Sequence, residues 1–196
     1  MAEHVNLVER KTGVKITRLR PDHDFEYDFS ERVSQRKDPT RTDGKGYGWP
    51  SVCCRWCTRV KTETISRYLR TIYPCMRVVQ SIGFAVGEER RLKGRMAGGG
   101  FRFPLIEYNI DEREALIYCK NLGYTWGGLY DYFGRVSCFC CPLQSRANLM
   151  LLKRHFPDLY GRCLAMDDLA ASNKGGGCFF KRPQTLHDLD HLLPGK

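Results

Sequence analysis

The chain has 196 residues, with 32 Lys and Arg against 22 Asp and Glu, which gives a net charge of +10. That length fits one domain, and 42% hydrophobic with 12% aromatic residues excludes a wholly disordered chain. No apolar run approaches the roughly 18 residues that a membrane helix needs, and the N-terminus carries no secretory signal. We therefore expect a single basic domain over residues 1–196, soluble and cytoplasmic.

The first part of the chain predicts three helices and one strand. The apolar residues of 2–12 indicate a short helix that ends at Gly13. Residues 14–19 alternate between apolar and polar side chains, which is typical of a strand. A second short helix is expected over 24–36, and the apolar residues of 62–73 share one face of an amphipathic helix.

The second part predicts a buried strand and then helices. The apolar run of 77–86 indicates the strand. The helices follow at 111–122, 144–155, 158–169 and 185–193. Strands that alternate with helices predict an α/β fold, a mainly parallel sheet flanked by helices. Few strands are visible, so we expect this sheet to be incomplete and the C-terminal portion, 97–196, to be helical and cysteine-containing.

Six of the ten cysteines gather in two clusters, and each cluster contains a C-x-x-C pair. That spacing lets two thiolates of one turn bind one metal, and two such turns complete a four-sulfur site. The predicted ligands are Cys54, Cys57, Cys138 and Cys141, with Cys53 and Cys140 as alternates. Four thiolates suit structural zinc and an iron–sulfur cluster equally, and zinc is slightly ahead by frequency.

Two other interpretations of the cysteines remain open. One C-x-x-C pair alone could be a dithiol redox pair. All six clustered cysteines could also be buried and unligated, although clustered thiols are sensitive to oxidation. The four single cysteines are expected to be packed thiols. These are Cys75, Cys119, Cys163 and Cys178.

A basic segment, Arg90 to Arg95, directly follows the strand predicted at 77–86. Ligands of open α/β sheets bind at the carboxyl ends of the strands, and Arg and Lys bind phosphate or sulfate. We therefore expect an anionic ligand such as a nucleotide, with nucleic acid as the alternative. Tyr47, Trp49 and Trp56 could stack on a base, although core packing is more common. No hydrolase or P-loop motif is present, so no catalytic residue is assigned.

Four segments resemble the signatures of phosphoadenosine phosphosulfate (PAPS) reductase-like proteins. The family signatures are R-W-C-T-x-x-K, G-x-R-x-x-E-S-x-R-R, F-P-L-x-x-W and R-x-G-C-x-x-C-P. The matching segments are RWCTRVK at 55–61, SIGFAVGEERR at 81–91, FPLIE at 103–107 and RVSCFCCP at 135–142. The opening segment through Leu19 is similar to the second helix and strand of the family, so the resemblance covers nearly the whole chain.

The resemblance implies an adenine nucleotide α-hydrolase-like fold and sulfur chemistry, either sulfur transfer or the reduction of a sulfonucleotide by an oxidoreductase. It also implies a [4Fe–4S] cluster on Cys57, Cys138 and Cys141, with Cys54 or Cys53 as the fourth ligand, and so favours iron–sulfur over zinc. It places Lys61, Glu88 and Arg91 at the anionic ligand. Together with nearby basic residues, these positions form the predicted anion-binding set. Its members are Arg59, Lys61, Glu88, Arg90, Arg91 and Arg135.

The chain departs from the family in three features. The S-G-G-x-D-S phosphate loop and the strand before it are missing, as is the C-terminal K-E-C-G-x-H motif. Ala85 and Gly87 replace the arginine and aspartate of the family. We expect a second chain, or coding sequence upstream, to supply the phosphate loop, and we expect no stand-alone catalysis. The alternatives are a non-catalytic, zinc-stabilised module that binds nucleic acid or a protein partner, and a homologue with a new function.

Overall fold

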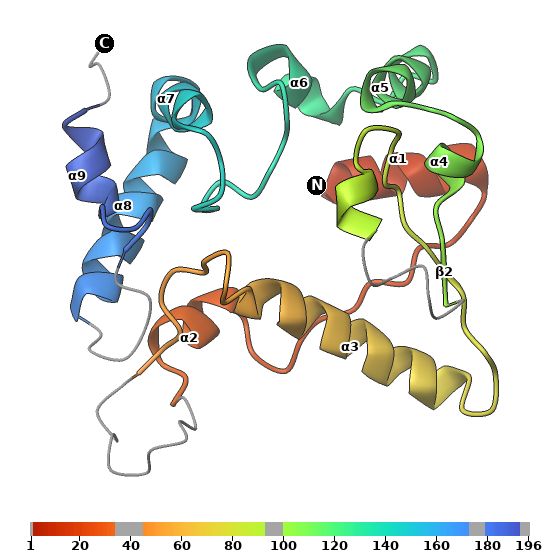
Figure 1. Cartoon of the computed structure of the whole chain (residues 1–196), viewed down its shortest axis with the longest axis horizontal. Coiled ribbons are helices and arrows are strands. Elements are labelled where there is room, and N and C mark those ends of the chain that lie inside the picture. Colours follow the sequence, from red (N-terminus) through yellow and green to blue (C-terminus); the bar gives the residue numbers. More distant parts are fainter. Residues whose placement is uncertain (1, 34–44, 93–99, 173–178, 193–196) are drawn as a thin grey trace. The chain divides into compact units, whose positions relative to one another are not determined.

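The computed structural model describes residues 2–33, 45–92, 100–172 and 179–192 (Figure 1). The chain divides into two compact units, each built from two separate stretches. Unit 1 comprises Met1–Thr17 with Ile65–Leu129, and unit 2 comprises Arg18–Thr64 with Tyr130–Lys196. Each unit therefore combines an N-terminal and a later stretch of the sequence. The expectation of one domain with a helical portion over 97–196 stays a prediction.

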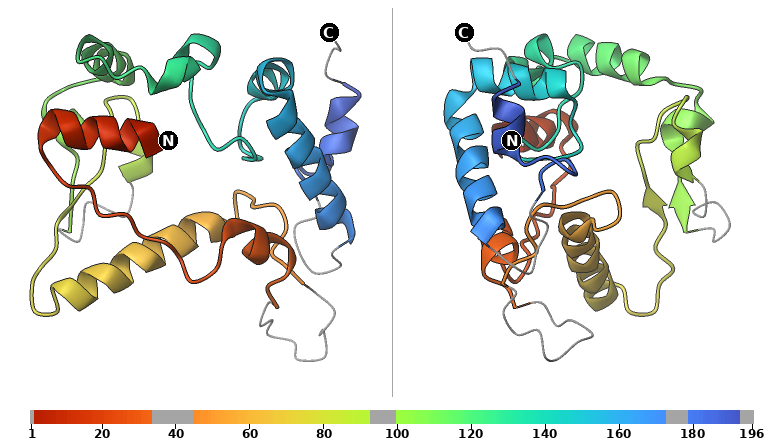
Figure 2. Two further views of the ribbon diagram at one scale, coloured as in Figure 1. Left: turned by 180° about the vertical axis from the view of Figure 1, so that it is seen from behind. Right: turned by 60° about the vertical axis from the view of Figure 1, so that its left-hand side comes forward.

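Unit 2 is a group of helices packed around α8. It contains α2 (Phe25–Ser30), α7 (Arg146–His155), α8 (Pro157–Ser172) and α9 (Leu186–Asp190). The long α8 packs against the other three helices, and α7 and α9 lie beside it in every view (Figures 1 and 2). The helices predicted at 144–155 and 158–169 are confirmed, while the helix predicted at 185–193 shortens to α9, and residue 193 lies outside the described part. Each of the three has a local start signal. Ser145 and Thr185 cap α7 and α9, and Pro157 opens α8.

The core of unit 2 combines aliphatic and aromatic side chains from all of these helices. Leu149, Cys163 and Leu186 are fully buried in it. Trp49 and Trp56 are also buried, so core packing, rather than stacking on a base, accounts for both tryptophans. Folding of this unit therefore removes a large apolar area from water. Each Å² of buried apolar surface stabilises the folded state by about 25 cal/mol.

Unit 1 holds a small parallel sheet among helices. Strand β1 (Gln80–Ser81) pairs in parallel with β2 (Phe101–Arg102). The helices are α1 (Ala2–Thr12), the C-terminal part of α3 (Trp56–Ile72), α4 (Pro104–Glu107) and α5 (Glu112–Asn121), with short 3-10 turns η1 (Glu89–Leu92) and η3 (Trp126–Gly128). A short helix, α6 (Leu129–Tyr132), begins at the last residue of unit 1, and its other residues belong to unit 2.

The predicted sheet is reduced to these two strands in the part of the chain that the structure describes. The strand expected at 14–19 is wrong: these residues form no ladder, and Val14 is exposed. The strand expected at 77–86 shortens to β1, whose two residues are exposed rather than buried, with one parallel bridge from Val86 to Asp111. A segment with alternating apolar and polar residues forms a strand only where a neighbouring strand completes its backbone hydrogen bonds. No described neighbour does so for residues 14–19. The α/β prediction therefore holds in a coarse form, as a mostly helical protein with a small parallel sheet.

Two further predicted helices have different bounds in the structure. The helix expected over 24–36 ends at Ser30 in α2, and residues 34–36 lie outside the described part. The helix expected over 62–73 starts earlier, at Trp56, because the buried indole fixes its first turn. Its predicted apolar face is not buried, since Ile65 and Ile72 are exposed. Among the described helices, none has the length and apolar character needed to cross a membrane.

Candidate metal centre and anion site

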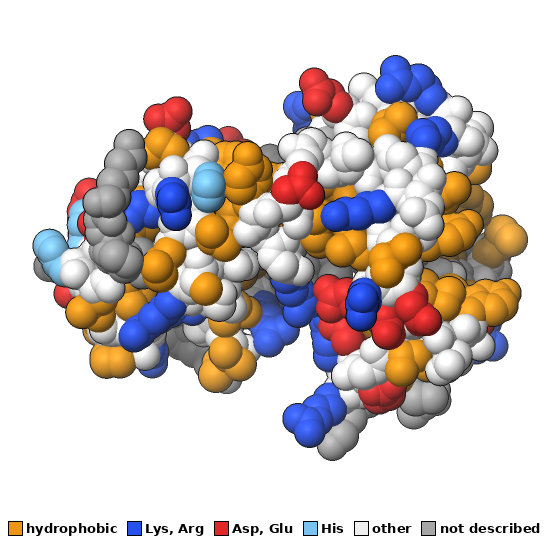
Figure 3. Space-filling view, turned by 90° about the horizontal axis from the view of Figure 1, so that it is seen from above, with side chains coloured by type: hydrophobic (Ala, Val, Ile, Leu, Met, Phe, Trp, Pro, Cys, Tyr) orange, Lys and Arg blue, Asp and Glu red, His pale blue; other side chains and the backbone are white. Residues whose placement is uncertain are grey.

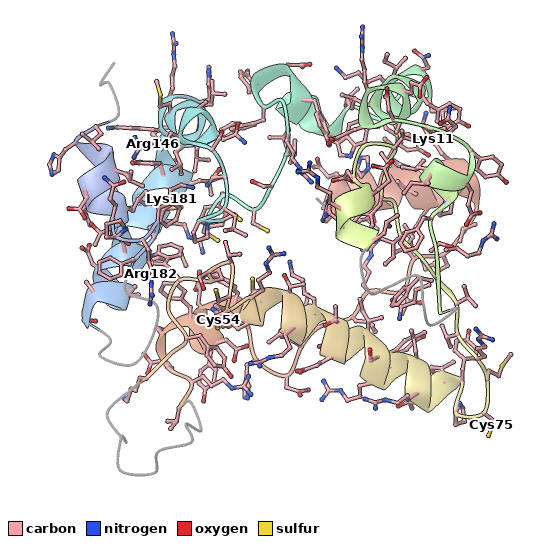
Figure 4. All side chains as sticks on the ribbon, viewed as in Figure 1. Lys11, Cys54, Cys75, Arg146, Lys181 and Arg182 are labelled. Carbon is pink, nitrogen blue, oxygen red and sulfur yellow. The ribbon has the colours of Figure 1, made fainter. Side chains whose placement is uncertain are left out.

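The first cysteine turn lies immediately before α3, where Figure 4 labels Cys54. The Cys54 N–H donates to Ser51 Oγ at 3.1 Å, and the Ser51 N–H donates to the Cys54 carbonyl at 3.0 Å. Trp56 then anchors the helix start in the core, with its ring stacked on Phe25 and its Nε1–H bonded to a backbone carbonyl. This leaves Cys54 exposed and Cys57 half-buried in the first helical turn.

The second cysteine turn is held by hydrogen bonds at both ends. The Cys141 N–H donates to the Cys138 carbonyl at 3.1 Å, which closes the C-x-x-C segment as a tight turn. Gln144 Nε2 donates to the Phe139 carbonyl at 2.8 Å. Lys181 Nζ donates to the Pro142 and Gln144 carbonyls, both at 2.6 Å. Burial lowers the pKa of Lys181, and the neighbouring Cys141 opposes this effect.

Both cysteine turns belong to unit 2 and pack on the same core. Cys57 and Phe139 lie against the buried cluster that includes Cys140. Burial, together with the charges of Cys138, Cys141 and Cys57, raises the pKa of the Cys140 thiol to about 11. The structure thus brings Cys57, at the start of α3, near the second cysteine turn, although 80 residues separate Cys57 from Cys138 in sequence.

The cysteines differ in their access to a metal. The structure buries Cys140 as a core thiol, while Cys54, Cys57, Cys138 and Cys141 all retain some exposure. Among the described residues, no group of three or more Cys, His, Asp or Glu is arranged to hold a metal ion. The four accessible thiols nevertheless have the donor chemistry that zinc and iron–sulfur clusters bind.

The single cysteines behave differently from one another. Cys163 is fully buried, as expected for a packed thiol, and burial raises its pKa to about 12. Cys119 is half-buried. The expectation for Cys75 is wrong, because it lies exposed just beyond the C-terminal end of α3 (Figure 4). Cys178 lies outside the described residues.

The predicted anion site follows β1 in unit 1. Leu92 is buried against Phe84 and Phe103, which anchors the η1 turn beyond the carboxyl end of the strand. Arg91 Nη1 contacts Glu88 Oε1 at 2.6 Å, and its guanidinium lies 4.3 Å from the centre of the Phe84 ring. These contacts orient Arg91 while leaving its side chain half exposed. Residues 93–95 of the basic segment lie outside the described part.

The other predicted anion-binding residues belong to unit 2. Arg59 lies on α3 with its guanidinium 3.8 Å from Glu63, and Lys61 is exposed two residues further on. Arg135 is exposed, and its carbonyl accepts a hydrogen bond from Asn148. The six residues are therefore divided between the two units, three in each.

Sequence reasoning did not single out Lys181, the residue that clamps the second cysteine turn. Its two acceptors lie 39 and 37 positions away, and no motif surrounds it. It belongs to a short segment that folds back in an antiparallel bridge with Gln184, next to exposed Arg182 (Figure 4). Only tertiary contact brings this cation to the cysteines.

The comparisons with known proteins identify distant relatives. No model of a known protein family matches the chain, and no solved structure matches it. The uncharacterized protein MJ0066 of Methanocaldococcus jannaschii is 27% identical over 166 residues, which covers 81% of this chain and 31% of that protein. The uncharacterized protein MJ0973 of the same organism is 25% identical over 122 residues, or 59% of this chain and 29% of that protein. The chain spans less than a third of the length of either relative.

Proposed function

We propose that this chain is a PAPS reductase-like protein with an adenine nucleotide α-hydrolase-like fold. It binds a [4Fe–4S] cluster through Cys54, Cys57, Cys138 and Cys141, and an anionic adenine nucleotide near Arg90 and Arg91. It takes part in sulfur transfer or sulfonucleotide reduction, together with a phosphate loop supplied by a second chain or by another part of a longer protein. The resemblance of four sequence segments supports this assignment.

The observation that carries the metal proposal is the packing of both C-x-x-C turns on one core in unit 2. Cys57 from the first turn and Cys140 from the second belong to the same apolar assembly. Cys140 fills space in that core, so the accessible thiols around it are the ones free to act as ligands. When bound, the cluster would supply electron transfer, while the two turns hold it and Lys181 fixes the backbone after Cys141.

The observation that supports the nucleotide proposal is the oriented Arg91 beyond the carboxyl end of β1. Parallel strands end at one edge, and the backbone there is available to an incoming ligand. Glu88 holds Arg91 in place, and Arg90 lies beside it on the same turn. A fixed guanidinium loses little side-chain freedom when it binds a phosphate or sulfate group.

The metal content of protein prepared without oxygen tests the proposed function. We expect iron and acid-labile sulfide in equal amounts, about four of each per chain, as a [4Fe–4S] cluster requires. Absorbance that bleaches on reduction would provide an independent check. One zinc per chain with no sulfide would instead support the alternative of a non-catalytic, zinc-stabilised module. Protein that purifies with neither metal and binds neither after anaerobic reconstitution would contradict both.

Replacing Arg90 and Arg91 together by alanine tests the anion site. We expect the double variant to bind adenosine 5′-phosphosulfate at least about tenfold more weakly, because two charge-assisted contacts are lost. Isothermal titration calorimetry on the full chain would measure this. The matched control is Arg113→Gln, an exposed cation on α5. Equal affinities for the double variant and this control would remove the nucleotide assignment.

Nucleic acid as a partner has weaker support from the surface. On the face drawn in Figure 3, Lys and Arg side chains are interspersed with acidic and apolar ones. Nonspecific binding of nucleic acid depends on many phosphate contacts along one continuous basic surface. We therefore place a small anionic ligand ahead of nucleic acid.

A further inference from the structure

A cavity of about 340 Å³ lies within unit 1, between α1 and the turn that leads into α6. It shares no residue with the cysteine turns or with the Arg90–Arg91 turn. Its lining residues are Glu3, His4, Leu7, Arg10, Thr125, Trp126, Gly127 and Leu129. The volume is at the lower end of the range for small-molecule sites, about 300–1,000 Å³.

One wall of the cavity is a single face of α1. Glu3, Leu7 and Arg10 recur at the three- and four-residue spacing that aligns side chains along a helix. The acidic and basic members are seven positions apart, which corresponds to about 10 Å along the helix axis. In the described part of the chain, neither Glu3 nor Arg10 takes part in an ion pair. The wall therefore offers an acceptor at one end, an apolar middle and a cation at the other end.

The opposite wall is an aromatic turn with an unusual backbone. Trp126, Gly127 and Gly128 have φ values of 49°, 65° and 79°, three consecutive residues in the left-handed region. Glycine adopts this region freely, but for tryptophan it costs about 1–2 kcal/mol. Such strain persists only where surrounding contacts impose it, and it concentrates at functional sites.

Contacts from α1 hold this turn in place. The His4 ring stacks on Trp126 with centroids 5.2 Å apart and meets Tyr124 edge-on at 5.7 Å. Lys11 Nζ donates to the Leu122 carbonyl and lies 5.3 Å from the centre of the Tyr124 ring. The aromatic wall is thus fixed from the same helix that carries Arg10.

We propose that this cavity binds a flat heteroaromatic ring joined to an anionic group, of the kind found in a nucleoside monophosphate. The ring of the ligand lies along the wall formed by His4 and Trp126, because an aromatic side chain can stack on any nucleic-acid base. Arg10 binds the anionic group, and Glu3 accepts a hydrogen bond from a ring or exocyclic N–H at the far end. This site is independent of the proposed function and stands apart from the nucleotide site at Arg90 and Arg91.

Nuclear magnetic resonance on full-length chain labelled with ¹⁵N at tryptophan tests the proposal, with adenosine monophosphate as the probe. The chain has three indole N–H groups. Those of Trp49 and Trp56 are buried and hydrogen-bonded in unit 2, so they are internal controls. Trp126→Gly identifies the third signal, since glycine accepts the φ of 49° without strain. We expect adenosine monophosphate to shift only the Trp126 signal, with saturation below about 10 mM.

Variants and smaller probes separate the proposed contacts. Arg10→Gln should weaken binding at least about tenfold, while Arg113→Gln, an exposed cation elsewhere in unit 1, should change it less than about twofold. Adenosine should bind about tenfold more weakly than its monophosphate, and inorganic phosphate alone should leave the Trp126 signal unmoved. An unmoved Trp126 signal at about 10 mM probe, or equal affinity in Arg10→Gln, would overturn the proposal. If the Arg90 and Arg91 double variant abolished the shift, the binding would belong to the other site and the cavity would lose its assignment.

Discussion

The variants Cys57→Ser and Cys138→Ser are each expected to abolish metal binding and to lower the free energy of unfolding by about 3 kcal/mol or more. Each change removes one thiolate from the proposed four-sulfur site, and a hydroxyl does not replace it as a ligand. Both residues lie at turns packed on the core of unit 2, so metal loss also loosens the fold around Cys140. Metal content of anaerobically prepared protein and urea unfolding would measure the two effects.

The structure supplies matched controls for this experiment. Cys75→Ser changes an exposed thiol in unit 1 and should alter neither metal content nor stability. Cys140→Ser should keep the metal but lower stability by about 1–3 kcal/mol, because it buries a hydroxyl in the core. Equal behaviour of the variants at 57, 138 and 75 would refute the four-thiolate site. Metal loss in the Cys140 variant with retention in the Cys138 variant would transfer the ligand role to Cys140.

The variant Asp167→Ala is expected to lower the free energy of unfolding by about 3 kcal/mol. Asp167 is buried, and its carboxylate accepts hydrogen bonds from Trp49 Nε1 at 2.7 Å and from the Leu186 N–H at 2.6 Å. The His187 N–H adds a third bond at 3.2 Å. Removing the carboxylate leaves these donors without an acceptor and removes the hydrogen bonds that link α8 to the start of α9. The midpoint of urea unfolding would report the loss.

The neighbouring residue is a matched control for Asp167. Asp168 carries the same side chain on the same helix, but it is exposed, and among the described residues it pairs with exposed His187, at 2.8 Å. Asp168→Ala should change stability by less than about 0.5 kcal/mol, as is typical of surface pairs. Comparable losses in both variants would show that helix propensity, rather than the buried bonds, determines the effect.

Local signals explain which parts of the fold were predictable. Asp111 caps α5 with a reciprocal capping box, and Gly123 follows it at a φ of 77°, so the start and end of that helix were readable in sequence. The sheet was not readable in the same way. The alternation over 14–19 is as regular as in many strands, but hydrogen bonding in a strand depends on a neighbour that sequence spacing does not specify.

The same distinction applies to the candidate sites. The two C-x-x-C pairs and the basic segment after β1 follow from residue spacing alone, because a metal turn and an anion-binding turn need only adjacent residues of the right type. The sequence by itself therefore determined which residue types are available for chemistry and where most helices begin.

Only the tertiary structure decided which of these residues meet. It buried Cys140 and exposed Cys75, joined Lys181 to the second cysteine turn, and divided the anion-binding set between two units. It also formed the cavity between α1 and the Trp126 turn, two segments that lie more than 110 positions apart in sequence. The physical reason is that burial and contact depend on the packing of distant segments, whereas caps, turns and helical faces depend on neighbours a few residues away.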